Sequence, residues 1–217
     1  MARGGIVLCG GRSTRMGLDK ATLPFGPERM LQRVVRLLGE AVDVIVVVAA
    51  PGQELPPLPG SVRLARDQRE SRGPLEGLFA GLGALPPGIE AAYATSCDVP
   101  LLEPKFVRRM FDLLGTAAAA VPVSDGYHHP LAAVYRPAAV TPAIEALLKA
   151  DRLRPIFLFD AVPTHLVQPA ELVDVDRQLA TLENLNRPED YLAALSRAGF
   201  APPADVLAHF TEQKPNG

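Results

Sequence analysis

The sequence has little cysteine, no excess of basic residues and no long apolar run. Its two cysteines, Cys9 and Cys97, are too few for a disulfide scaffold and too far apart for a CxxC zinc motif, so we expect free thiols. A formal net charge of −2 at pH 7 favours small molecules over nucleic acid as partners. No stretch is long enough to span a membrane, and the apolar run before Gly10 is too short for a signal-peptide core. We therefore expect a cytoplasmic protein with no nucleic-acid or membrane partner.

The chain of 217 residues is long enough for one α/β domain with a substantial core. Hydrophobic residues make up 48% of it and charged residues 21%, which is the usual balance of a globular protein. We predict a single domain over residues 1–200 and leave the tail, residues 201–217, unassigned. Length alone leaves a division into two domains open.

Apolar runs alternate with amphipathic stretches along the first half of the chain. Strands are expected at residues 5–9, 43–49, 62–65 and 91–97, and helices at 28–38, from 73 onward and at 103–114. The run at 43–49 is uninterrupted and β-branched, a pattern typical of a strand that helices cover on both faces. The alternation predicts an α/β fold with a doubly wound, mostly parallel sheet in three layers, which binds ligands at the carboxyl ends of its strands.

The order of the strands decides which residues meet at that edge. In the common order 3-2-1-4, the first and fourth strands are neighbours. Asp98, which follows the fourth strand, then faces the loop after the first strand. Cys9 and Cys97 also come close together, since adjacent strands lie about 4.8 Å apart.

The second half of the sequence is less regular. Strands are expected at 117–122, 131–135 and 164–167, and helices at 137–149 and 187–198. We predict a polar loop at 124–129 and an extended segment, returning toward the sheet, at 181–186. The apolar stretch at 156–159 is compatible with a helix or a strand.

The stretch from Leu8 to Lys20, LCGGRSTRMGLDK, joins the first apolar run to the first helix. Gly10 and Gly11 allow the backbone to turn sharply and approach a ligand closely. Arginine and lysine side chains, here Arg15 and Lys20, suit phosphate oxygens in different ways, so we interpret the loop as a triphosphate cradle. The alternative is a glycine-rich turn with solvated arginines. The loop has neither the GxGxxG nor the GxxxxGK[ST] spacing of the two commonest phosphate loops.

Asp98 follows a predicted buried strand, in the segment Cys97-Asp98-Val99-Pro100. Mg²⁺ prefers one or two carboxylates together with substrate phosphates and water, so we predict that Asp98 holds this ion. The alternative is a solvent-facing aspartate at a strand end.

The string LxGGRSxRMGxDK resembles the signature loop of the nucleotidyltransferases that include the molybdenum cofactor guanylyltransferases, the MobA family. The segments GPLEGL, CDVP and NLNRPEDY are similar to further elements of that family, and the resemblance extends from Ile6 to about Ala198. Two positions depart from the family pattern. Cys9 replaces a usual alanine, and Ala49 stands where a nucleotide-contacting asparagine is common, which puts that contact in doubt.

The resemblance implies a Rossmann-like nucleotidyltransferase fold and the transfer of GMP from Mg-GTP to molybdopterin, with release of pyrophosphate. It also implies transient contact with cofactor-delivering proteins. The catalytic residues that it implies are Arg15, Lys20 and Asp98, with Asp98 as the Mg²⁺ ligand. The implied nucleotide-binding residues are Leu8, Cys9, Gly10, Gly11, Lys20, Asp67, Gly73, Pro74, Leu75 and Asp98. The implied substrate contacts are His129, Asn184 and Asn186.

Several alternatives stay open from the sequence. Asp67 suits a turn, His129 an ordinary loop position and Asn186 a helix N-cap. The same fold also serves cytidylyltransferases and sugar-phosphate nucleotidyltransferases. A non-catalytic nucleotide-binding domain has no need of a metal carboxylate, and an NAD-dependent oxidoreductase is disfavoured by the missing GxGxxG.

Overall fold

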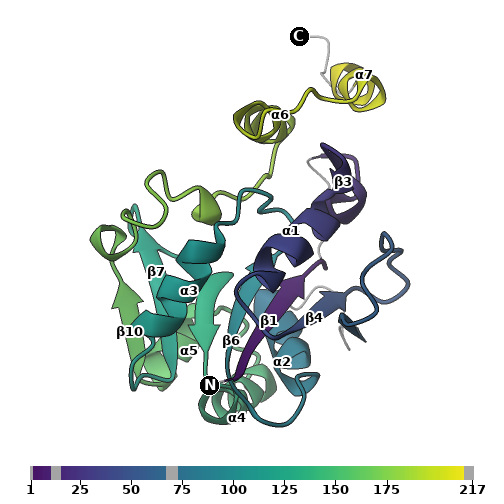
Figure 1. Cartoon of the computed structure of the whole chain (residues 1–217). Helices are drawn as coiled ribbons and strands as arrows, with labels where there is room; N and C mark the ends of the chain where they lie inside the picture. The colour runs from purple at the N-terminus through teal and green to yellow at the C-terminus, as the bar shows by residue number, and fades with distance from the viewer. Residues whose placement is uncertain (1, 11–15, 67–72, 213–217) are drawn as a thin grey trace.

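The computed structural model describes residues 2–10, 16–66 and 73–212. They form a central sheet with helices on both faces, in three layers (Figure 1). The eight strands of this sheet are β1 (Ala2–Leu8), β4 (Val44–Ala49), β5 (Arg63–Arg66), β6 (Ile89–Ser96), β7 (Ala119–Ser124), β8 (Tyr127–His128), β9 (Ala132–Tyr135) and β10 (Thr164–Val167).

The strand order is β10-β7-β9-β6-β1-β4-β5, with β8 paired to β7. The pairs β1–β4, β1–β6, β4–β5 and β7–β10 are parallel. β9 runs antiparallel to both β6 and β7. The predictions of a mostly parallel sheet and of the order 3-2-1-4 for the first four main strands are therefore confirmed.

Alternate side chains of β1 point into two separate cores, because successive residues of a strand face opposite sides. Val7 lies in the core under α1 (Met30–Gly39) and α3 (Pro104–Leu113). Ile6 and Leu8 lie in the other core, under α2 (Pro74–Gly83), α4 (Pro137–Lys149) and α5 (Ile156–Ala161). β1 is thus buried on both faces, and its carboxyl end is the natural place for a ligand.

A third apolar cluster joins the C-terminal helices to the segment after the signature loop. α6 (Pro188–Arg197) and α7 (Ala204–Glu212) lie beside β2 (Pro24–Phe25) and β3 (Glu28–Arg29) at one end of the molecule (Figure 1). The ring of Phe25 meets Tyr191 and Phe200 edge to face, with centroids 6.3 and 5.9 Å apart. Tyr191 meets Phe210 of α7 at 5.9 Å. These contacts hold α6, and hence the segment before it, close to the signature loop.

The structure corrects or completes four local expectations. The polar loop at 124–129 contains β8, a short hairpin partner of β7 that has too few residues to show alternation. Residues 180–182 form a 3-10 helix (η3) instead of an extended return, because the buried Asp176 carboxylate accepts from the backbone N–H groups of Ala180 and Thr181. The ambiguous stretch at 156–159 is helix, and the unassigned tail contains α7.

The close contact between α2 and β1 gives a testable prediction for two glycines of the same helix. A Cβ at Gly81 would lie 2.5 Å from Ile6 Cγ2 and 3.1 Å from Val48 Cγ2, whereas a Cβ at Gly83 would meet nothing within 4 Å. We expect Gly81→Ala to destabilise the protein by about 1–3 kcal/mol through overpacking. Gly83→Ala should stabilise it by about 0.5–1 kcal/mol, because alanine is the better helix former. Urea unfolding measures both, and equal effects of the two variants would contradict this packing.

Candidate active site

The ends of β1 and β6 lie side by side, with Leu8 opposite Ser96 in the parallel ladder. The loop after β1 leads to Lys20, and the turn after β6 carries Asp98, so both residues start from the same edge of the sheet. Lys20 Nζ donates to Asp98 Oδ2 at 2.7 Å. The strand order therefore does bring Asp98 to the signature loop, as the sequence predicts.

The Asp98 carboxylate is buried and held from two sides. Asp98 is only 8% exposed. Ser96 Oγ donates to its Oδ1, and Lys20 Nζ donates to its Oδ2. Its backbone carbonyl accepts from Leu185 N at 3.0 Å, which ties the segment before α6 to the turn. The alternative of a solvent-facing aspartate at a strand end is therefore wrong. Ser96 has no motif of its own, and its place two residues before Asp98 is the only signal that the sequence holds.

Asn186 completes this cluster from the opposite end of the chain. Its Oδ1 accepts from Lys20 Nζ at 2.9 Å. The cap of α6 is Arg187, and Asp190 Oδ2 accepts from the backbone N–H groups of Asn186 and Arg187 at 3.1 and 2.9 Å. The N-cap interpretation of Asn186 is therefore wrong, because its side chain is directed to the lysine instead. Asn184 is exposed.

Lys20 opens a short 3-10 helix, η1 (Lys20–Thr22), that Asp19 caps. Asp19 Oδ1 accepts from Ala21 N at 2.9 Å, which satisfies one donor at the helix start. The Lys20 side chain is 16% exposed, so its charge is partly withdrawn from water. An ammonium group in such a place interacts more strongly with a phosphate than it does on an open surface.

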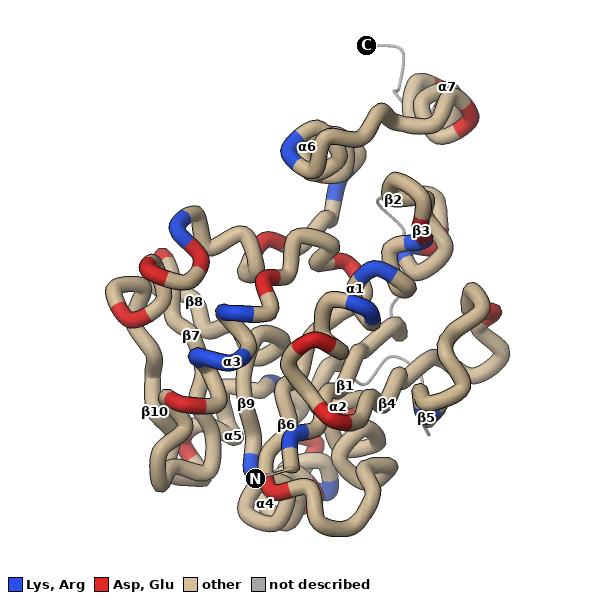
Figure 2. The backbone as a smooth tube through the Cα atoms, in the orientation of Figure 1, with Lys and Arg blue, Asp and Glu red and all other residues tan. Residues whose placement is uncertain are grey.

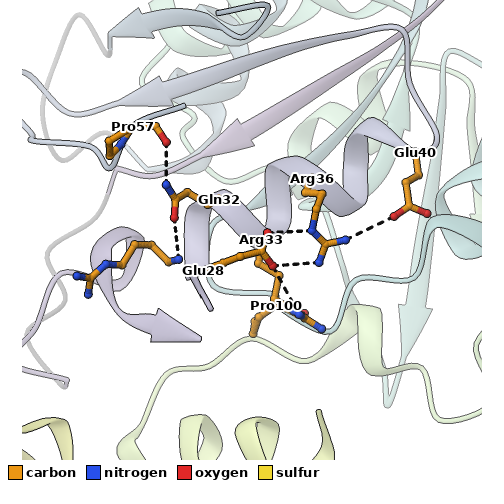
Figure 3. Close-up of polar contacts among 8 residues, drawn as sticks. Glu28, Gln32, Arg33, Arg36, Glu40, Pro57 and Pro100 are labelled. Carbon is orange, nitrogen blue, oxygen red and sulfur yellow. Dashed lines mark hydrogen bonds and ion pairs between the residues drawn. The ribbon is translucent and has the colours of Figure 1, made fainter. Parts of the chain in front are cut away.

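Arg33 of α1 contacts the turn that carries Asp98. No motif in the sequence indicates this contact. Arg33 Nε donates to Pro100 O at 2.7 Å, as Figure 3 shows beside the Glu28–Arg36 ion pair. Its guanidinium lies 5.0 Å from the Phe25 ring centroid and 5.6 Å from that of Phe200. Burial lowers the pKa of Arg33 from its usual value. Arg33 thus joins α1, the turn after β6 and the C-terminal aromatic cluster.

Cys9 and Cys97 lie directly after the paired strands, as the strand order predicts. Cys97 N donates to Leu8 O at 3.0 Å, which brings the two cysteines side by side at the ends of β1 and β6. Both cysteines are free and buried. The hydrogen bond with Cys9 and burial raise the pKa of the Cys97 thiol well above its usual value. A thiol that keeps its proton is a poor nucleophile and a poor metal ligand.

The residues predicted to bind nucleotide are distributed around the β1 end. Leu8 and Cys9 are buried and Gly10 is exposed at the start of the loop. Gly73, with a φ of 79°, and Pro74 are exposed at the start of α2, whereas Leu75 lies in the core. Any contact of Leu75 with a ligand is therefore through its backbone. Gly11, Arg15 and Asp67 lie outside the described residues.

His129 lies on a hairpin at the same edge of the sheet. β7 runs in the same direction as β6, since both are antiparallel to β9, so the hairpin after β7 is on the side of Asp98. His129 N donates to Pro122 O at 2.9 Å, and burial lowers the pKa of its imidazole. The neighbouring His128 ring packs on Phe159, with centroids 5.5 Å apart. The two histidines thus have separate environments.

Over the part of the chain that the structure describes, acidic and basic residues are interspersed along the backbone (Figure 2). Within the same residues, no three His, Cys, Asp or Glu side chains are grouped as ligands of a metal ion. None of the described helices combines the length and the apolar character that crossing a membrane requires.

The family of the MobA-like NTP transferase domain matches residues 5–164, which include the carboxyl end of β1, the signature loop and the Asp98 turn. The chain belongs to this family. It is 42% identical over 140 residues to a protein of Mycobacterium avium, covering 63% of this chain and 70% of that protein. It is 40% identical over 136 residues to one of Mycobacterium tuberculosis, covering 61% and 67%. Both relatives are named "probable molybdenum cofactor guanylyltransferase".

Solved structures share the fold of this MobA-like chain. Molybdopterin-guanine dinucleotide biosynthesis protein A from Archaeoglobus fulgidus superposes with a TM-score of 0.73 at 18% identity, over 90% of this chain and 98% of that one. The 2-C-methyl-D-erythritol 4-phosphate cytidylyltransferase from Thermus thermophilus gives 0.69, also at 18%, over 92% and 100%. The predicted Rossmann-like nucleotidyltransferase fold is confirmed, and the pair shows that this fold serves more than one base and acceptor.

Proposed function

We propose that this protein is a molybdenum cofactor guanylyltransferase, which transfers GMP from Mg-GTP to the phosphate of molybdopterin and releases pyrophosphate. The observation that carries the proposal is the contact of Lys20 with Asp98 and Asn186 at the carboxyl edge of the sheet. The family and the names of its mycobacterial relatives support the choice of reaction. We place the reaction in the cytoplasm, with transient contacts to proteins that deliver the cofactor.

The chain supplies what phosphoryl-type transfer asks of a protein, which is positioning and electrostatic stabilisation. Lys20 has three N–H donors, of which Asp98 and Asn186 take two, and a phosphate oxygen suits the third. Arg15 would add a second cation to the same loop. The acceptor is itself a phosphate that is largely ionised near neutral pH, since its second pKa is about 6. No covalent nucleophile on the enzyme is required.

The described residues fit a magnesium ion. Mg²⁺ prefers hard oxygen ligands and commonly uses one or two carboxylates, with phosphates and water filling its octahedron. Asp98 offers such a carboxylate, and each of its oxygens keeps a lone pair beyond the one that accepts from Ser96 or Lys20. When bound, the ion would neutralise charge on the nucleotide phosphates. Ser96 and Lys20 would hold the Asp98 carboxylate in a single orientation for it.

The two ligands would lie on opposite sides of this cluster. The loop from Leu8 to Gly11, Asp67 and the start of α2 form the nucleotide side in our proposal. His129 on its hairpin and Asn184 form the acceptor side. Asn186 stands between the two, because it already contacts Lys20. The acceptor phosphate is thereby directed to the α-phosphate of the nucleotide beside the lysine.

The proposal predicts which nucleotide is used. Guanine presents donors and an acceptor that a matched site pairs, and such a site rejects an analogue that leaves its buried polar groups unpaired by large factors. With purified protein, Mg²⁺ and molybdopterin, we expect pyrophosphate release from GTP at least tenfold faster than from CTP. GTP with Mg²⁺ should also raise the Tm more than CTP at equal concentration, because the tighter ligand shifts stability further by mass action.

Omitting the acceptor is the control for this assay, since guanylyl transfer requires both substrates. A preference for CTP would overturn the guanylyl assignment and favour a cytidylyltransferase, with nucleotidyl transfer retained. If pyrophosphate release required a sugar phosphate instead of molybdopterin, the proposed acceptor would be wrong. Tight nucleotide binding without pyrophosphate release from any pair of substrates would favour a non-catalytic domain.

A further inference from the structure

Gln53 lies in the segment that follows β4, at the same edge of the sheet as the signature loop. Its side-chain amide reaches across to that loop. Nε2 donates to Asp19 Oδ2 at 3.1 Å and approaches Asp19 Oδ1 at 3.4 Å, and it also donates to Cys9 O at 3.3 Å. One side chain therefore contacts both the beginning and the end of the loop that connects β1 to Lys20.

The other half of the same amide, together with Arg66, fixes the backbone around Gln53. Its Oε1 accepts from Ala50 N at 3.1 Å, so the side chain also closes its own turn. Arg66, the last residue of β5, donates from Nη1 to Ala50 O at 2.8 Å and to Gln53 O at 3.0 Å. Arg66 directly precedes Asp67, a predicted nucleotide contact. The turn at 50–53 is thus connected to the strand that leads to the nucleotide side.

Asp19 links Gln53 to the start of the 3-10 helix that contains Lys20. Its Oδ1 accepts from Ala21 N at 2.9 Å and so starts η1, whose first residue is Lys20. Lys20 then reaches Asp98 at 2.7 Å. Hydrogen bonds to a carboxylate are about twice as strong as those between neutral groups, so the contact from Gln53 to Asp19 is the strongest one that its amide makes.

We propose that Gln53 is a positioning residue, which aligns Asp19 and the end of β1 with the turn at 50–53 and thereby sets the place of Lys20 relative to a bound nucleotide. The inference rests on the proposed function for its effect on turnover, but the placement of Lys20 can be measured without substrate. A displacement of about 1 Å at a reacting group can cost on the order of a hundredfold in rate. Loss of the Gln53 amide should therefore act on kcat more than on KM.

Gln53→Met keeps the length of the side chain and removes its donors and acceptor. Gln32→Met is the matched control, because the Gln32 amide also contacts the segment after β4, at Pro57 O (2.9 Å), and closes a helix start at Arg29 N (2.9 Å) (Figure 3). Within the described residues, its hydrogen bonds do not reach the signature loop. We expect Gln53→Met to lower kcat about tenfold or more with a smaller change in KM. Gln32→Met should keep kcat within about twofold and lose a similar amount of stability.

The substrate-free readout is the rate of reductive methylation of Lys20, followed by mass spectrometry, with exposed Lys105 and Lys149 as internal standards. Lys20 should react slowly in the wild type and in Gln32→Met, because Asp98 and Asn186 hold it. In Gln53→Met it should react several-fold faster. Unchanged Lys20 labelling in Gln53→Met overturns the inference, whatever the assays of turnover give. Faster labelling in a protein that turns over no GTP supports the inference and counts against the proposed function alone.

Gln53→Glu provides a second test, because a pH-dependent rate is expected only if the side chain at position 53 contacts Asp19. Its carboxylate would face Asp19, so one of the two must bind a proton for the contact to form again. The kcat of this variant relative to wild type should rise as the pH falls from 8 to 5.5, while the ratio for Gln53→Met stays constant. A ratio for Gln53→Glu that does not change with pH would count against the contact with Asp19.

Discussion

Replacing Asp98 with alanine is expected to lower turnover at least hundredfold and to leave the fold intact. The carboxylate is held by Ser96 and Lys20 at the edge of the sheet, where it contributes to the site more than to packing. Metal-assisted stabilisation of the transition state is worth several kcal/mol, and about 2.7 kcal/mol already corresponds to a hundredfold change in rate. The backbone bond from Leu185 N to Asp98 O does not depend on this side chain. Steady-state rates over a Mg²⁺ titration, with circular dichroism for the fold, measure the effect.

Two further variants sharpen this result. Asp98→Asn keeps the size of the side chain and removes its charge, so a loss similar to that of alanine would assign the effect to the charge. Asp112→Ala is the matched control, because Asp112 has a 67% exposed side chain and contacts only Arg3, at 3.5 Å, among the described ion pairs. It should keep the wild-type rate. Near-normal turnover of Asp98→Ala at saturating Mg²⁺ would show that the assigned role is wrong.

Lys20→Met should reduce kcat by a similar factor, on the order of a hundredfold, because one removed electrostatic donor typically costs 10²–10³ in rate. Lys20→Arg should not restore the rate, since a planar guanidinium cannot occupy the place of a compact ammonium between Asp98 and Asn186. Removal of the cation also leaves the buried Asp98 carboxylate with one partner fewer. We expect a loss of about 1–3 kcal/mol in the free energy of unfolding, measured with urea.

Lys149→Met provides the comparison for both readouts. Its ammonium lies in an exposed i,i+4 pair with Glu145, with a side chain that is 75% exposed. Such pairs contribute only about 0.3–0.5 kcal/mol, so neither rate nor stability should change much. If Lys20→Met retained kcat within threefold of the wild type, the lysine would have no part in the chemistry, and the contact with Asp98 would be structural only.

The sheet, and the meeting of Asp98 with the signature loop at its edge, could be predicted from the sequence. The β-branched run at 43–49 and the helices that alternate with the early strands dictate a parallel arrangement, because a strand without polar positions must be covered on both faces. The order 3-2-1-4 then follows from common topology, and it brings Lys20, Asp98 and the two cysteines to one edge. Such features are local or periodic, so they can be recognised along the chain.

The distant side chains that complete the cluster could not be predicted from the sequence. The contact of Lys20 with Asn186 joins positions 166 residues apart, and that of Gln53 with Asp19 crosses 34 residues. Arg33 reaches the Asp98 turn from a helix whose sequence shows only an amphipathic pattern. α7 is short, and its apolar residues gain their stability from Tyr191 and the aromatic cluster around it. No local pattern encodes these contacts, because their free energy depends on surfaces that meet only after the sheet has formed.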